Sequence, residues 1–212
     1  MTSHGPPTPE PHSAKVVVIP EDDVVFRLAQ LMLLMDSLSR IGQSGATLER
    51  LGCYDFLVAN PMLVLVDETD LDRKRLLMAG FDGRALSYAS PAHRFTTRRE
   101  RLQHDLSQLV AYGLVQPVAE KSILYQITAT GSALAERFTA VYAGAYRLSA
   151  ELLLRRLTKL SDKRLRESMA TWTTIGSASL RPEVLSLLDA IDLLEQQTAA
   201  GATVTTDAEE HR

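Results

Sequence analysis

The stretch RRERLQHDLSQLVAYGLVQPVAEKSILYQITATGSALAERF, residues 98–138, contains the pattern that decides the fold. Apolar residues at helical spacing predict an amphipathic helix that Gly113 ends. Two short apolar runs then flank the polar turn Glu120–Ser122, which is typical of a β-hairpin. Thr128 is a favourable N-cap for a following helix. Helix, strand, turn, strand and helix in this order are typical of a winged helix-turn-helix.

The flanking residues predict where these helices begin and end. Thr97 and Glu100 fit a capping box, so the first helix is expected to begin there. The helix after Thr128 continues with apolar spacings of four and three, and is expected to reach about Leu160 if nothing interrupts it. Ser161 caps a further short helix, which ends at a Gly176–Ser177 break. Pro182 opens a last helix.

Three more helices are predicted upstream. Pro20 suits the first position of a helix that runs to about Arg40, and the carboxylates after it suit the positive end of the helix dipole. Thr47–Ala59 is apolar around most of its circumference, which is typical of a central helix. Asp70–Ala79 predicts a short third helix. The β-branched run Lys15–Ile19 is either an edge strand or the lead-in to a helix.

The predicted fold class is therefore mainly α: a winged helix-turn-helix with a small β-hairpin wing and extra N- and C-terminal helices. We expect a Pro-rich disordered tail over residues 1–14 and a winged-helix domain with a long trailing helix over 15–160. A C-terminal helical appendage is expected over 161–197, and a second disordered tail over 198–212.

Composition favours a cytoplasmic protein without a membrane anchor. The 212 residues carry a formal net charge of −3 and a pI of about 6.0, which leaves room only for a local basic patch. Cys53 is the single cysteine and lies in an apolar run, as expected of a buried, reduced thiol. No signal peptide and no apolar stretch long enough to span a bilayer is present in the sequence.

The sequence contains no recognisable catalytic or cofactor-binding motif. It has no phosphate-binding loop, no dinucleotide-binding glycine turn, no HExxH and no cysteine pair. Only His93 and His104 lie in a structured region, and His104 follows Glu100 by one helical turn, so a surface pair explains it. We therefore expect a non-enzymatic protein with no cofactor and no metal site.

A group of basic residues raises the question of whether the protein contacts a DNA backbone. Four arginines and Glu100 lie between residues 94 and 101, for a local charge of +4 − 1 = +3 near the start of the helix before the hairpin. Two interpretations stay open: contact with phosphates, or arginines that are solvated or paired with acidic residues of the third helix. The candidate phosphate contacts are Arg94, Arg98, Arg99, Arg101 and, in the wing, Lys121.

The opposite face of the same helix is poor in groups that read bases. Rotation at 100° per residue leaves Gln108 as its one good base-reading side chain, and it puts Arg98 and Arg99 beside the buried stripe. A protein–protein module is therefore favoured over a sequence-specific repressor. The candidate partner interface consists of His104, Gln108, Val184, Leu187, Leu188 and Ile191.

Four segments resemble the middle component of bacterial ABC-type three-component defence systems, the group that includes Lamassu. They are VFRLAQLMLLMDSLSRIG (25–42), LERLGCYDFLVANP (48–61), the stretch 98–138 and LSDKRLRESM (160–169). The order of the helices carries the resemblance, since no catalytic signature is involved.

The resemblance implies a small non-catalytic accessory subunit that holds together an SMC-like (Rad50-like) ATPase and an effector, usually a nuclease. Such a complex would protect bacteria against phage or plasmids, and double-stranded DNA could be contacted through it. The alternative hypothesis is a dimeric winged-helix transcriptional regulator of the MarR or PadR kind, whose long helix makes the dimer.

Overall fold

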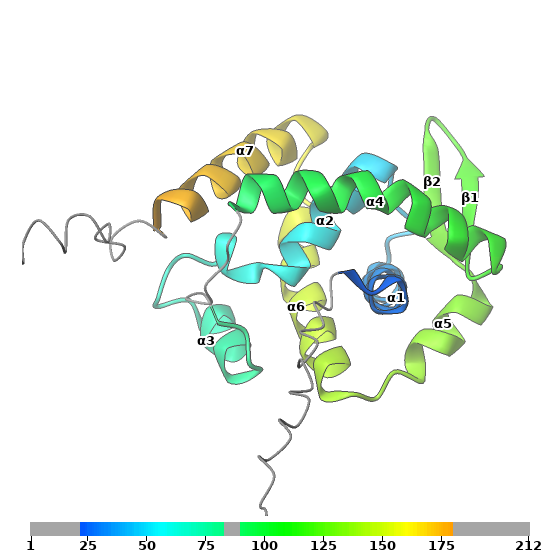
Figure 1. Ribbon diagram of the computed structural model, residues 1–212, viewed down its shortest axis with the longest axis horizontal. Helices are drawn as coiled ribbons and strands as arrows, with labels where there is room; N and C mark the ends of the chain where they lie inside the picture. The colour runs from blue at the N-terminus through cyan, green and yellow to red at the C-terminus, as the bar shows by residue number, and fades with distance from the viewer. Residues whose placement is uncertain (1–21, 83–89, 180–212) are drawn as a thin grey trace, which may run out of the picture.

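The computed structural model describes residues 22–82 and 90–179 of the chain. These residues form a bundle of helices with one β-hairpin at its edge (Figure 1). The elements in chain order are α1 (Val24–Arg40), α2 (Leu48–Ala59), a 3₁₀ turn η2 (Pro61–Leu63), α3 (Leu71–Met78), α4 (Pro91–Ala111), β1 (Val115–Ala119), β2 (Ile123–Ile127), α5 (Ala129–Glu136), α6 (Val141–Leu157) and α7 (Asp162–Ser179).

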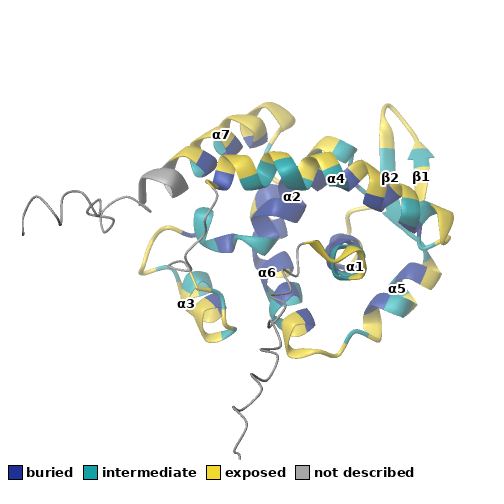
Figure 2. Cartoon of the chain, viewed as in Figure 1, coloured by how far each residue is buried: buried dark blue, intermediate teal, exposed yellow. Residues whose placement is uncertain are grey.

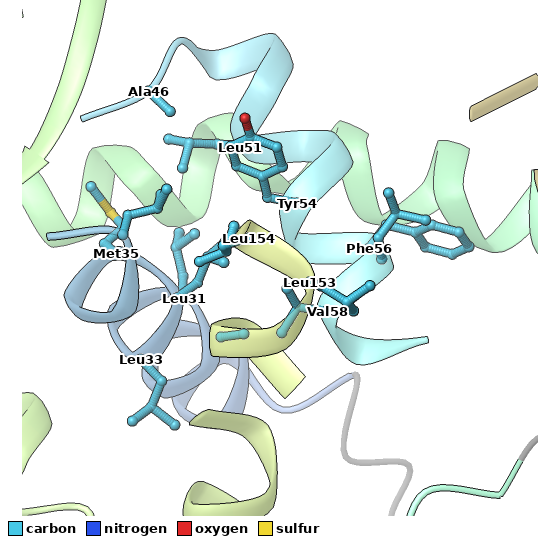
Figure 3. Close-up of a cluster of buried hydrophobic side chains, with 14 of the residues drawn as sticks. Leu31, Leu33, Met35, Ala46, Leu51, Tyr54, Phe56, Val58, Leu153 and Leu154 are labelled. Carbon is cyan, nitrogen blue, oxygen red and sulfur yellow. The ribbon is translucent and has the colours of Figure 1, made fainter. Parts of the chain in front are cut away.

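The core lies where α1, α2 and α6 meet. Every residue of α2 from Leu51 to Val58 is buried, as expected of a helix that is apolar on all sides. Figure 3 shows Leu31 of α1, Tyr54 of α2 and Leu153 of α6 converging in this core. In Figure 2 the same helices carry most of the buried residues, whereas α3 and the hairpin are largely exposed or half-buried. The prediction that 47–59 forms a central helix is confirmed.

The hairpin follows α4 as the winged-helix pattern predicts. β1 and β2 pair antiparallel in a register that places Val115 opposite Ile127, and Ala46, just before α2, adds a bridge to Tyr125. Gly113 has a φ of +68°, the left-handed conformation that glycine adopts at helix ends. The mainly helical, winged-helix-like class predicted from the sequence is therefore confirmed.

The Thr-x-x-Gly motif after β2 has a steric explanation. Thr128 caps α5 by accepting a hydrogen bond from the N–H of Gly131, and its own hydroxyl donates to the carbonyl of Gly113. A Cβ at Gly131 would lie 2.2 Å from the carbonyl oxygen of Leu114, so the tight approach of α5 to the hairpin requires glycine there.

Two predicted helix starts are wrong. α1 begins at Val24 instead of Pro20, because the Asp23 carboxylate caps it by accepting hydrogen bonds from the next turn. α4 begins at Pro91 instead of Thr97. Ser90 is its N-cap and a proline fills its first position, so Thr97 lies inside the helix and makes no capping box.

The long trailing helix is interrupted, which corrects a second expectation. α5 ends at Glu136 and α6 starts at Val141. The guanidinium of Arg147 donates to the carbonyls of Ala135 and Phe138, at 2.5 and 2.9 Å, and so satisfies backbone acceptors that the break would leave free. The expected break at Gly176–Ser177 is also wrong, since α7 continues to Ser179.

Candidate interaction surface on helix α4

Helix α4 occupies the position of the recognition helix in a winged helix-turn-helix, directly before the hairpin. Leu102, Leu106 and Leu109 bury its inner face in the core. The arginines predicted to contact phosphate lie along its first three turns. Their accessibility decides what the helix can bind.

Arg98 points inward and is part of a buried polar network. Its guanidinium donates to both carboxylate oxygens of Asp55 on α2, one at 3.0 Å, and to the side-chain oxygen of Gln30 on α1 at 2.7 Å. The side chains of Arg98 and Asp55 are only 14% and 8% exposed. Burial alone would lower the pKa of Arg98, but attraction to Asp55 outweighs it and raises that pKa. Arg98 is therefore a structural cation, unavailable to a phosphate.

The network continues to α6. The side-chain amide of Gln30 donates to the hydroxyl of Tyr142, whose ring packs 5.0 Å from that of Phe26 between centroids. Tyr146 lies one turn further along α6, fully buried, and its hydroxyl has no hydrogen-bond partner among the described residues. Burial raises the pKa of this phenol well above its ordinary value, so Tyr146 is neutral. The network thus joins α1, α2, α4 and α6.

A second buried ion pair ties α4 to α1. The guanidinium of Arg27 donates to both oxygens of Asp105, at 2.9 and 3.1 Å, and the two side chains are 12% and 6% exposed. Sequence reasoning missed Asp105. The available signal was a carboxylate inside the apolar stripe of α4, next to Leu106, where a charge needs a partner.

Two further arginines that were predicted to contact phosphate have partners outside the buried network. Arg94 donates to the side-chain oxygen of Asn60 at 2.7 Å, and Arg101 pairs with Asp22 at 2.9 Å on the surface. Arg94, Arg98 and Arg101 thus have partners within the chain, but these are Asn60, Asp55 and Asp22, whereas the second interpretation placed the partners on the third helix. α3 pairs instead with Arg156 of α6.

Arg99 and Lys121 remain as outward cations. Both are exposed, and neither makes a hydrogen bond or ion pair with any residue the structure describes. Lys121 lies in the turn of the hairpin, so the two belong to different elements. The structure therefore does not bring the five predicted basic residues together into one outward patch.

The outer face of α4 carries a polar pair. The imidazole of His104 and the side-chain amide of Gln108 lie 2.8 Å apart, one helical turn from each other. The expected pairing of His104 with Glu100 is replaced by this contact. Since Gln108 already has a partner, the one good base-reading side chain of this face is partly occupied. Tyr112, at the end of the helix, is 69% exposed.

Helix α7 packs along α4 (Figure 1). It buries Leu165 and Met169 against the core and half-buries Trp172. A helix that reads bases enters the major groove with a free outer side. Because α7 lies alongside α4, it reduces the part of the α4 surface that could enter a major groove. The predicted interface residues Val184, Leu187, Leu188 and Ile191 lie outside the described residues.

No group of three or more His, Cys, Asp or Glu residues close enough to hold a metal occurs in residues 22–82 and 90–179. Cys53 is buried, and burial, assisted by the negative charge of Glu49, raises its pKa to about 11. Such a thiol is a poor nucleophile at neutral pH. Within the same residues, no helix combines the length and the apolar character that crossing a membrane requires.

Comparison with known proteins points to one family. No curated protein and no solved structure gives a significant match to the chain. Residues 87–175, from just before α4 into α7, match the sequence model of the ABC-three component (ABC-3C) system Middle Component 2. The matched segment contains all of α4, the hairpin, α5 and α6. The resemblance to an ABC-type middle component is therefore confirmed over residues 87–175, which are similar to the Middle Component 2 family of ABC-three component systems.

Proposed function

We propose that this protein is a non-catalytic accessory subunit that links an SMC-like ATPase to a nuclease effector in a cytoplasmic anti-phage or anti-plasmid complex. The match of residues 87–175 to the model of a middle component supports partnership with other subunits of such a system. The identity of those subunits and the linking role are the proposal, and the helical fold without a recognisable catalytic motif supports it.

The observation that carries the proposal is that three of the four arginines of α4 already have partners within the chain. Arg98 is buried on Asp55, while Arg94 and Arg101 contact Asn60 and Asp22. Sequence readout needs several Arg, Lys, Asn or Gln side chains aimed at base edges. The outer face of α4 offers Gln108, which already contacts His104. A protein surface is the better match for such a helix.

Tyr112 is the best anchor on this surface. It is a large amphipathic side chain, 69% exposed, at the junction of α4 and the hairpin. Tyrosine and arginine are enriched among the interface residues that contribute most to binding, and both Tyr112 and Arg99 are exposed here. We expect the partner subunit to cover Tyr112 and Gln108 together, since both lie towards the C-terminal end of α4.

The test is co-expression with the products of the neighbouring genes, followed by sizing of the complex. Tyr112→Ala should weaken capture of the partner at least tenfold, about the effect of removing an interface anchor. Lys159→Ala is the matched control, because Lys159 is exposed at the far end of α6. Equal capture by both variants would remove α4 from the interface. Failure of the wild-type chain to co-purify with either subunit would overturn the linking role.

A DNA-binding assay separates the proposal from the regulator alternative. We expect weak, sequence-independent binding whose salt dependence falls by about one unit of slope for each of Arg99→Glu and Lys121→Glu. Arg98 is unsuitable for this test, because replacing a buried, paired cation destabilises the fold. Nanomolar binding of the isolated chain to one palindromic site in physiological salt would favour a transcriptional regulator instead.

A further inference from the structure

Helix α3 presents an apolar and basic stripe to solvent. Leu71, Lys74, Arg75 and Met78 stand at positions i, i+3, i+4 and i+7, which is one face of a helix. Leu71 and Met78 are 72% and 82% exposed, whereas Leu76 on the opposite face is fully buried. Two long apolar side chains at the ends of one stripe, with two cations between them, form a surface suited to an amphipathic partner that carries acidic residues.

The stripe is held rigidly in place. Arg156 of α6 donates to the carboxylates of Asp70 and Asp72 at the start of α3. Arg73 donates to the carbonyl of Leu65 at 2.7 Å and contacts the sulfur of Met62 in η2. These contacts fix the helix by its inner side and its first turn, so Leu71 and Met78 point outward without the freedom to fold back. A fixed apolar surface of this kind favours docking.

The chain itself supplies a segment of matching chemistry. Residues 182–195, PEVLSLLDAIDLLE, carry apolar residues at helical spacing and four acidic residues with no basic one, a net charge of −4. The acidic residues are Glu183, Asp189, Asp192 and Glu195. This charge is opposite to that of Lys74 and Arg75. The apolar stripe of the segment, centred on Leu188, would cover Leu71 and Met78.

Helix α7 is connected to α3 through the 3₁₀ turn η2. α7 packs against η2, and η2 is tied to α3 through Arg73. Figure 1 shows the C-terminal end of α7 on the same side of the molecule as α3. Val184 follows Ser179 by five positions, a stretch of chain that spans up to about 17 Å when extended. We propose that residues 182–195 dock on the Leu71–Met78 stripe of α3 in the same chain.

Cross-linking of engineered cysteines in the isolated full chain tests this docking. Cys53 is buried, so it does not compete with added exposed thiols. With a short bis-maleimide, Met78→Cys together with Leu188→Cys should give a bridged single chain, identified by intact mass. Ile123→Cys with Leu188→Cys is the matched control, because Ile123 is 59% exposed on the hairpin. We expect bridging at least tenfold faster in the first pair.

Charge reversal provides a second, independent test of the docking. Lys74→Glu with Arg75→Glu should slow bridging by up to about fivefold, the size expected of surface ion pairs, and Asp189→Lys with Asp192→Lys should restore it. Far-ultraviolet circular dichroism checks that each variant is folded. Bridging no faster than in the Ile123 control, or bridging only between two chains, overturns the proposal. Because the assay uses the chain alone, its failure leaves the binding of partner subunits through α4 untouched.

Discussion

Arginine serves opposite purposes on the inner face of α4 and on the exposed flank beside it. Arg98 on the inner face is 14% exposed and donates to Asp55 and Gln30, whereas Arg99, the next residue, is exposed and has no partner among the described residues. A step of one residue, 100° around the helix, therefore separates a cation that holds four helices together from one that is free to meet a partner. A count of arginines along a helix cannot make this distinction, whereas their angular positions can.

The largest expected effect concerns the inner face. Arg98→Ala leaves the buried carboxylate of Asp55 without its partner, and we expect it to lower the free energy of unfolding by about 3–5 kcal/mol. Urea unfolding followed by circular dichroism measures this change. Arg99→Ala is the matched control and should lie within about 0.5 kcal/mol of wild type. Equal losses in the two variants would erase the distinction between the faces.

A double variant sharpens the same comparison. Asp55→Leu combined with Arg98→Met removes both charges and fills the space with apolar atoms, which often costs little compared with removing one partner. We expect it to recover most of the stability lost in Arg98→Ala. If the double variant is as unstable as the single one, the pair matters through the hydrogen bond to Gln30 as well.

The second ion pair of the inner face should give the next largest effect. Arg27→Ala removes two charge-assisted hydrogen bonds to Asp105, and we expect a loss of about 1.5–3 kcal/mol in the free energy of unfolding. Arg101→Ala, whose pair with Asp22 is exposed, should lose less than about 1 kcal/mol. A larger loss for Arg101 than for Arg27 contradicts the ranking by burial.

Much of this architecture is predictable from local sequence signals. Thr47, Asp70, Gly113 and Thr128 mark helix ends by side-chain capping or by a left-handed backbone, and the structure places helix ends at each of them. The predicted start of α4 is wrong because Ser90-Pro91 and Thr97 are both favourable positions for the N-terminus of a helix. The tertiary contact between Phe95 and Phe56, with centroids 5.3 Å apart, favours the earlier one.

The site was less predictable than the fold. Helical periodicity placed Arg98 beside the buried stripe, but its partners Asp55 and Gln30 lie 43 and 68 residues away in sequence. No local signal shows which carboxylate will meet a given arginine. The break between α5 and α6 was hidden for the same reason, since Arg147, which satisfies its carbonyls, is nine or more residues away.

An exposed ion pair away from α4 should give a smaller effect that depends on pH. The hydrogen bond from Arg156 lowers the pKa of Asp70, and the backbone N–H of Asp72 adds to this. The stabilisation is therefore present above the ordinary aspartate pKa of about 4 and is lost as the pH falls through the lowered value. Asp70→Asn keeps a capping side chain but removes the charge. Its melting temperature should be slightly below that of wild type at pH 7, and the difference should vanish in strong acid. A constant difference at all pH values assigns the effect to the cap.

The smallest change in stability is expected at the exposed flank of α4 that carries Arg99, where partner binding is the more informative measurement. Arg99→Glu should unfold within about 0.5 kcal/mol of wild type, because Arg99 has no partner among the described residues. If α4 meets a partner subunit through this face, the same variant should lose capture of that subunit, and most of the loss should appear as faster dissociation. Surface plasmon resonance of the variant beside Arg99→Lys separates charge from side-chain length. Unchanged capture by Arg99→Glu, with Tyr112→Ala also unchanged, would show that the free face of α4 is solvated in the complex, and the partner would have to be sought on another surface.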